Sequence, residues 1–90
     1  MKKFRLMIVT PTGKKFDDEV EQISLMGECG SLSVLADHIP FVTNIKAGKC
    51  RIYSDGEVTH CQTADGLLSV TDENVRIITS SFFENESGEE

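Results

Sequence analysis

The sequence has no long hydrophobic run anywhere in its 90 residues. A helix that crosses a bilayer needs about 18–20 consecutive apolar residues, and no segment approaches that length. Lys2 and Lys3 lead into alternating apolar and polar residues, whereas a secretory signal would continue into an unbroken apolar core. We therefore expect a soluble, cytosolic protein that makes no direct insertion into lipid.

Basic residues are also scarce, with 9 Lys and Arg against 15 Asp and Glu and a formal net charge of −6. Binding to nucleic acid or to anionic lipid requires clustered Lys and Arg, so neither is an expected partner. Four of the acidic residues fall within residues 84–90, a segment without any apolar residue. We predict one folded domain over residues 1–83 and an acidic disordered tail over residues 84–90.

The motifs of common catalytic and nucleotide-binding sites are missing. There is no Gly-x-Ser-x-Gly elbow, and Gly13-Lys14-Lys15 lacks the Ser or Thr that completes a phosphate-binding loop. Cys29 and His38 could form a nucleophilic pair, but Glu28 beside the cysteine disfavours the thiolate. We expect neither enzymatic activity nor a cofactor.

The three cysteines, Cys29, Cys50 and Cys61, are an odd number, which fits a reducing compartment better than a disulfide framework. Together with His38 and His60 they could be imagined as zinc ligands, but no Cys-x-x-Cys or His-x-x-x-His spacing supports this alternative. We expect the cysteines to pack as small apolar side chains, and we expect no metal.

Alternating apolar and polar residues predict short β-strands. Phe4, Leu6 and Ile8 alternate with Arg5 and Met7, as expected for a strand with one buried side. Similar strand-like segments occupy residues 32–35, 41–46, 49–53, 67–71 and 75–79. The segment 16–25 is ambiguous from its own residues, because its apolar positions also fit one side of a helix.

Turn residues separate these segments. Asp55-Gly56 predicts a tight hairpin flanked by Tyr53 and Val58. Pro40 withholds a ladder donor and favours extended geometry at Ile39, so it marks a sheet edge or a crossing between sheets. Eight or more short strands without a long helix predict a sandwich or barrel.

A longer pattern lies between Gly27 and Gly48. Its order of glycine, histidine and proline resembles the segment Leu-Pro-Gly-x-x-Gly-Glu-Leu-Gly-Ile-Leu-x-Gly-His-x-Pro-x-x-Thr-x-Leu-x-x-Gly of F-type ATP synthase epsilon subunits. The matching positions are Gly27, Gly30, Leu32, His38, Pro40, Thr43 and Gly48. Residues 4–11, 64–70 and 75–79 are also similar to strands of that family.

The resemblance implies an all-β fold, a β-sandwich or flattened barrel of about ten short strands in two sheets, with strands in the ambiguous segment. It implies a non-catalytic central-stalk subunit that links the gamma subunit to the c-ring and couples proton flow to ATP synthesis. Such a subunit lies at the cytoplasmic face of a bacterial membrane, held there only through the complex. The implied gamma contacts are His38, Ile39, Pro40 and Thr43, and the implied c-ring contacts are Gly27, Glu28, Gly30, Ser31, Leu32 and Ser33.

The sequence departs from the family pattern at several positions, and Ser31 stands where a glutamate is common. Family members usually continue into a two-helix domain, whereas this sequence ends after the acidic segment, so we expect no carboxy-terminal helical hairpin. A free-standing β-sandwich adaptor that binds another protein through an exposed sheet edge is the alternative function.

Overall fold

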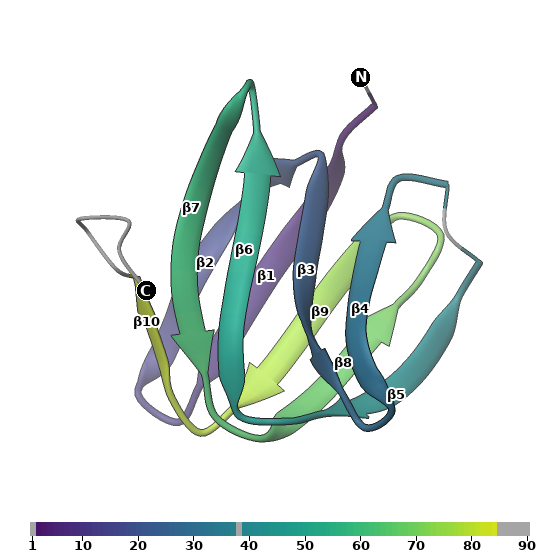
Figure 1. The fold of residues 1–90 in the computed structure, drawn as a ribbon. Helices are drawn as coiled ribbons and strands as arrows, with labels where there is room; N and C mark the ends of the chain where they lie inside the picture. Colours follow the sequence, from purple (N-terminus) through teal and green to yellow (C-terminus); the bar gives the residue numbers. More distant parts are fainter. Residues whose placement is uncertain (1, 38, 85–90) are drawn as a thin grey trace.

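The computed structural model describes residues 2–37 and 39–84, and most of them lie in strands (Figure 1). The strands are β1 (Phe4–Thr10), β2 (Gly13–Val20), β3 (Gln22–Gly27), β4 (Gly30–Leu35), β5 (Phe41–Ile45), β6 (Gly48–Ser54), β7 (Glu57–Thr63), β8 (Gly66–Val70), β9 (Asn74–Thr79) and β10 (Phe82–Glu84). The described residues include no helix, and hence none that could cross a membrane. Glu84 ends β10, so the sheet reaches one residue into the predicted tail, and residues 85–90 lie outside the described part.

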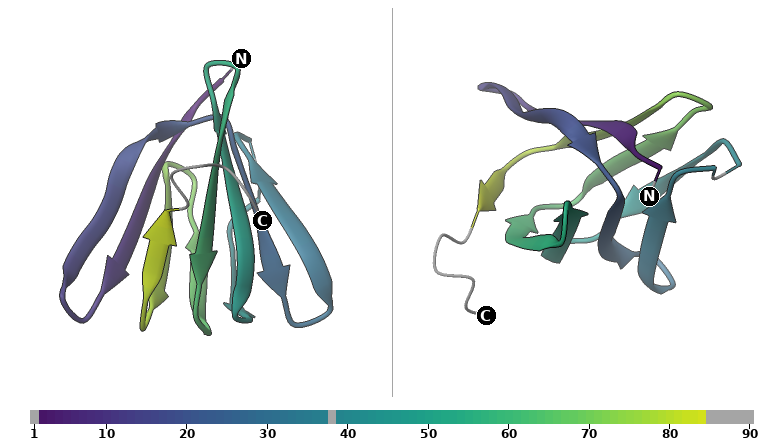
Figure 2. Two further views of the ribbon diagram at one scale, coloured as in Figure 1. Left: turned by 60° about the vertical axis from the view of Figure 1, so that its left-hand side comes forward. Right: turned by 90° about the horizontal axis from the view of Figure 1, so that it is seen from above.

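The strands form two facing sheets of five, which we call sheet A and sheet B. Sheet A has the order β4-β3-β6-β7-β10, and sheet B has the order β5-β8-β9-β1-β2. Within the described residues the only strand pairing between the two sheets is Gly27↔Ile45, next to a 2.9 Å bond from the Lys46 N–H to the Met26 carbonyl. Figure 2 shows the two layers from the side and from above. The predicted sandwich or flattened barrel of two sheets is confirmed.

The core lies between the sheets and follows from the two-residue period of each strand. The side chains of Leu6 and Ile8 from β1 are completely buried, as are Leu68 from β8 and Ile77 from β9. Sheet A contributes further buried side chains, among them Ile23, Leu25, Val34, Cys50, Ile52 and Cys61. The alternation predicted for residues 4–8 is therefore confirmed.

The ambiguous segment is β2 followed by β3. Phe16 and Val20 both face the core from β2, whereas Ile23 and Leu25 face it from β3. The alternation changes phase at Glu21, which lies between the two strands. The core-facing residues have even numbers in β2 and odd numbers in β3. This change at Glu21 produced the apparent helical spacing of the apolar residues.

The Asp55-Gly56 turn is built as its residues predict. Both turn residues have positive φ, 55° at Asp55 and 80° at Gly56, as a two-residue type I′ hairpin requires. Ser54 pairs with Glu57 next to the turn, and Tyr53 pairs with Val58 one step further along. This hairpin fixes the register of β6 and β7.

Candidate functional site

The first candidate surface is the tip of the β3–β4 hairpin. Glu28 and Cys29 form the turn between the paired residues Gly27 and Gly30, and both turn side chains are exposed. Gly30 has a φ of +124°, which L residues rarely adopt. The tip thus depends on glycine at this position.

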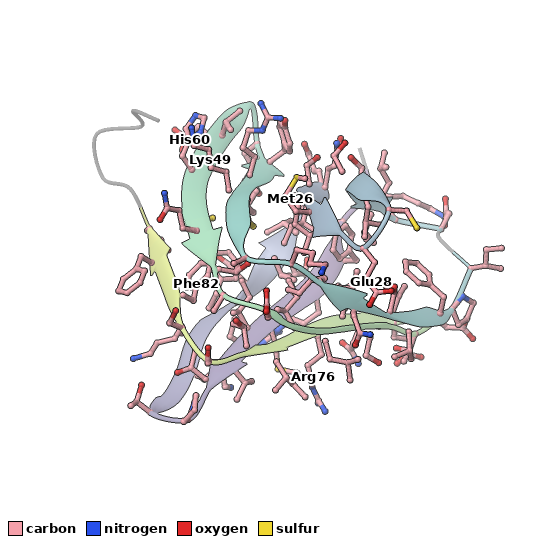
Figure 3. The ribbon with its side chains drawn as sticks, turned by 60° about the horizontal axis from the view of Figure 1, so that its bottom comes forward. Met26, Glu28, Lys49, His60, Arg76 and Phe82 are labelled. Atoms are coloured by element: carbon pink, nitrogen blue, oxygen red, sulfur yellow. The ribbon has the colours of Figure 1, made fainter. Side chains whose placement is uncertain are left out.

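Glu28 is held toward the neighbouring strand. Its carboxylate oxygen Oε2 accepts a 3.0 Å hydrogen bond from Nδ2 of Asn44 in β5, and the contact is exposed to solvent. Figure 3 labels Glu28 at this end of the molecule, next to β5. The hairpin tip therefore presents an oriented negative charge.

The remaining predicted c-ring residues separate into two groups. Ser31 and Ser33 point outward from β4 and are exposed, and the Ser33 hydroxyl lies 2.8 Å from that of Ser24. Leu32 points the other way and packs against the core. Gly27 is buried, and a Cβ there would lie 3.0 Å from Cδ2 of Leu32. Gly27 and Leu32 thus shape the hairpin, while the exposed residues are available for contact.

The second candidate surface lies in the link from β4 to β5 and at the start of β5. Ile39 is 80% exposed and Pro40 is also exposed, whereas His38 lies outside the described residues. Thr43 is half-buried on the core side of β5, where its hydroxyl donates to the carbonyl of Asn44 at 3.4 Å. Val42, which is 63% exposed, extends the apolar surface of Ile39 and Pro40.

Sequence reasoning missed Val42 because it transferred Thr43 from the family pattern. The alternation along β5 would have found it, since Phe41 and Ile45 are apolar and face the core, which leaves Val42 facing outward. The two candidate surfaces lie near opposite ends of β4 (Figure 1). The molecule thus presents two separate surfaces rather than one combined site.

The cysteines and histidines do not assemble into a metal centre in the described part of the chain, where no group of three or more His, Cys, Asp or Glu side chains could hold an ion. Cys29 is exposed at the hairpin tip, whereas Cys50 and Cys61 are buried opposite each other in β6 and β7. A hydrogen bond with Cys50, together with burial, raises the pKa of the Cys61 thiol. Cys50 and Cys61 therefore pack as small apolar residues, as predicted, whereas the exposed Cys29 does not.

Residues 3–85 match the family described as ATP synthase, Delta/Epsilon chain, beta-sandwich domain. The chain belongs to this family. The resemblance drawn from the Gly27–Gly48 pattern is thereby confirmed, and so is the expectation of a non-catalytic chain, because the delta/epsilon chain is not a catalytic chain of the synthase.

Curated relatives in the family are named ATP synthase epsilon chain. The relative from Alkaliphilus oremlandii (strain OhILAs) is 38% identical over 78 residues, which cover 87% of this chain and 58% of that protein. The relative from Bacillus subtilis (strain 168) is 33% identical over 81 residues, which cover 90% of this chain and 61% of that protein. The chain thus spans roughly three fifths of the length of these relatives.

Two solved structures share the fold. The mitochondrial ATP synthase of Euglena gracilis, solved as OSCP/F1/c-ring, contains a chain with a TM-score of 0.86 and 20% identity; the match covers 97% of this chain and 56% of that one. The central stalk and c-ring of the Tetrahymena thermophila enzyme contain a chain with a TM-score of 0.77 and 16% identity; the match covers 91% of this chain and 66% of that one. At these identities the likeness shows the fold alone.

Proposed function

We propose that this protein is the sandwich domain of a non-catalytic rotor subunit in a bacterial F-type ATP synthase, where it links gamma to the c-ring and couples proton flow to ATP synthesis. The observation that carries the proposal is the family match over residues 3–85. The relatives named epsilon chain and the central stalk with c-ring of Tetrahymena support it.

The β3–β4 hairpin tip is the proposed contact with the c-ring. Glu28 offers a carboxylate, and Gly30, Ser31 and Ser33 offer exposed backbone and hydroxyl groups without bulky side chains. A polar tip of this kind suits the polar loops of a membrane ring, because each contact remains near water. Gly27 and Leu32 support the tip from beneath.

The β4–β5 link is the proposed contact with gamma. Ile39, Pro40 and Val42 form an exposed apolar surface, and burying apolar area is the main driving force for stable association. His38 belongs to the same proposed contact by its place in the family pattern, and so does Thr43, which lies half-buried next to Val42 in β5. The domain would reach the cytoplasmic face of the membrane only through these protein contacts.

Gamma capture with surface variants tests the proposal. The 90-residue chain is mixed with the gamma subunit of the same synthase and recovered through a tag on gamma. The unmodified chain should be retained, and the double variant Ile39→Ser with Pro40→Ala should bind at least about tenfold more weakly, because it removes central apolar contacts.

The matched control is Val58→Ser, which removes an exposed apolar side chain that is 44% accessible beside the β6–β7 turn. This variant should bind gamma like the unmodified chain. Failure of gamma to retain the unmodified chain would reject the stalk assignment in favour of the adaptor alternative. Equal weakening by both variants would reject the proposed location of the contact.

A further inference from the structure

The outer face of sheet A has a charge opposite to that of the whole chain. Lys49, Arg51 and His60 occupy outward positions on β6 and β7, and no Asp or Glu occupies an outward position on β3, β4, β6 or β7. Sheet B differs, because Asp17 forms ion pairs there with Arg5 and Lys14, and Glu19 lies opposite Arg5. A protein of net charge −6 therefore gathers positive charge on one side.

A cavity opens in this face where two strands separate. Pairing of β3 with β6 ends at Ser24↔Arg51, and β3 then approaches β5 at Gly27↔Ile45. The separation leaves a cavity of about 230 Å³. Figure 3 labels Lys49, His60 and Met26, which border this cavity, on one side of the molecule, and Arg76 on the other.

The cavity has an apolar floor and a positive rim. Met26, which is 38% exposed, contributes an accessible apolar side chain, and Leu25, Cys50 and Cys61, almost fully buried in the core, close the floor. The protonated Cys61 thiol adds no negative charge to it. The rim holds Lys49 and Arg51, and neither takes part in any ion pair found among the described residues.

Hydroxyl groups complete the wall. Ser31 of β4 borders the cavity and is exposed, and Ser24 borders it from β3. Such an arrangement of a mainly apolar pocket with a few converging polar groups is typical of small-molecule sites. The absence of a carboxylate among the lining residues makes the site selective for negative charge.

We propose that this cavity binds a small organic anion whose carboxylate or phosphate group pairs with Lys49 and Arg51 while a compact apolar body covers the floor. Charge-assisted hydrogen bonds to the basic rim hold the anionic group, and burial of the apolar body adds hydrophobic stabilisation. The volume lies below the roughly 300–1,000 Å³ of drug-sized sites, so the ligand is about the size of one aromatic ring with a charged group. The site shares Ser31 with the proposed c-ring contact and includes none of the residues proposed to contact gamma.

The test is a ¹H–¹⁵N NMR titration of the 90-residue chain with four probes: phenyl phosphate, benzoate, inorganic phosphate and benzyl alcohol. Phenyl phosphate and benzoate should shift the amide signals of Leu25, Cys50 and Cys61 saturably, with a Kd of about 1 mM or lower. Inorganic phosphate lacks the apolar body and benzyl alcohol lacks the charge, so each should bind at least about tenfold more weakly.

Charge-removing variants locate the site. Arg51→Gln and Lys49→Gln should each raise the Kd for phenyl phosphate by about fivefold to tenfold. Arg76→Gln, an exposed change on sheet B, should leave it unaltered. Absence of saturable shifts below about 10 mM probe, or an unchanged Kd in both rim variants, would overturn the proposal. A peptide of residues 84–90 serves as a further probe. If this peptide saturates the cavity and the organic probes do not, the occupant is a protein segment, and the proposal of a small organic anion is overturned.

Discussion

Gly66, at the start of β8, is the residue where a single added carbon should do the most damage. A Cβ at this position would fall on the backbone carbonyl of Ile78 in the neighbouring β9. Backbone in a paired strand cannot easily move aside, so Gly66→Ala should lower the free energy of unfolding by about 2–4 kcal/mol. Urea denaturation measures the change.

Gly48→Ala is the control, because a Cβ there would meet Cγ of Met26 at 3.0 Å, and a Met side chain can rotate away. Its cost should stay below about 1 kcal/mol. If both variants lose a similar free energy of unfolding, contact with the Ile78 backbone is not the reason why position 66 requires glycine.

Asp17 should make stability depend on acidity. Its carboxylate accepts hydrogen bonds from Nε of Arg5 at 2.5 Å and from Nζ of Lys14 at 2.7 Å. These bonds, that from Arg5 first, lower the pKa of Asp17 from 3.8 to about 2. The folded state therefore favours the charged form, and this stabilisation is present above pH 3.8 and disappears as the pH falls to about 2.

The substitution Asp17→Asn removes this pH-dependent contribution. The unmodified chain should unfold at a higher urea concentration than the variant at neutral pH, and the difference should shrink as the pH falls through that window. Urea titrations at several pH values provide the measurement. A difference that stays constant from neutral pH down to about pH 2 would show that the ion pairs are not its source.

Glu28, and not Ser31, should be the electrostatic contact with the c-ring. The Glu28 carboxylate is presented by the same hairpin as Ser31 and is oriented by Asn44, whereas Ser31 carries no charge. An exposed ion pair contributes only about 0–1 kcal/mol, so loss of charge at position 31 alone costs little. In the assembled synthase, Glu28→Gln should reduce retention of the subunit modestly, and Ser31→Ala should leave it unchanged.

The informative counterpart is Ser31→Glu, which should partly restore retention in the Glu28→Gln background by replacing the charge nearby. Retention is measured by washing the immobilised complex at increasing salt, since salt screens exposed charges. If Ser31→Ala releases the subunit while Glu28→Gln does not, the hairpin is recognised by hydroxyl contacts, and the charge argument fails.

Among the strands, β10 should be held against the core mainly by the side chain of Phe82. Phe82 is 8% exposed and belongs to the core cluster, whereas Phe83 is 63% exposed on the other side of the same short strand. Phe82→Ala should cost about 2–4 kcal/mol of unfolding free energy, and Phe83→Ala should cost less than about 1 kcal/mol. Denaturant unfolding of both variants tests this, and equal costs would show that burial of Phe82 is not what holds β10 in place.

Some of the strands and turns could be predicted from the sequence, and others could not. The Asp55-Gly56 hairpin was predictable because both positive-φ positions follow from local residue chemistry. The strands around Glu21 were not predictable from periodicity alone, since the phase changes between β2 and β3. The core-facing orientation of Leu32 and Thr43 was also missed. A family motif gives the residue types at matching positions, but it does not tell which side of a strand faces the core.

Other features depend on tertiary structure and have no local signal. The cavity at the end of the β3–β6 pairing arises because β3 leaves β6 for β5, strands from distant parts of the sequence. The opposition of Cys50 and Cys61 follows from the hairpin register, but their burial depends on the facing sheet. Sequence reasoning identified the residues of the hairpin tip, yet only the fold separates its exposed residues from its supports.

At the scale of the whole molecule, the two sheets pack face to face and carry separate candidate surfaces near the two ends of β4. A subunit that transmits torque between two partners requires such an arrangement, because packed sheets resist deformation better than a single hairpin. The proposed anion cavity borders the hairpin surface at Ser31 and includes none of the residues of the β4–β5 link, so its occupation can be measured independently of gamma binding.

Reconstitution tests the stalk function most directly. Membranes carrying the synthase of the same organism are stripped of their epsilon chain, and the 90-residue chain is added back before proton-driven ATP synthesis is measured. The account predicts that synthesis is restored by the unmodified chain and by Val58→Ser, and is restored poorly by Ile39→Ser with Pro40→Ala. Retention of the unmodified chain on the stripped complex without any recovery of synthesis, or recovery that is equal for all three chains, would contradict it.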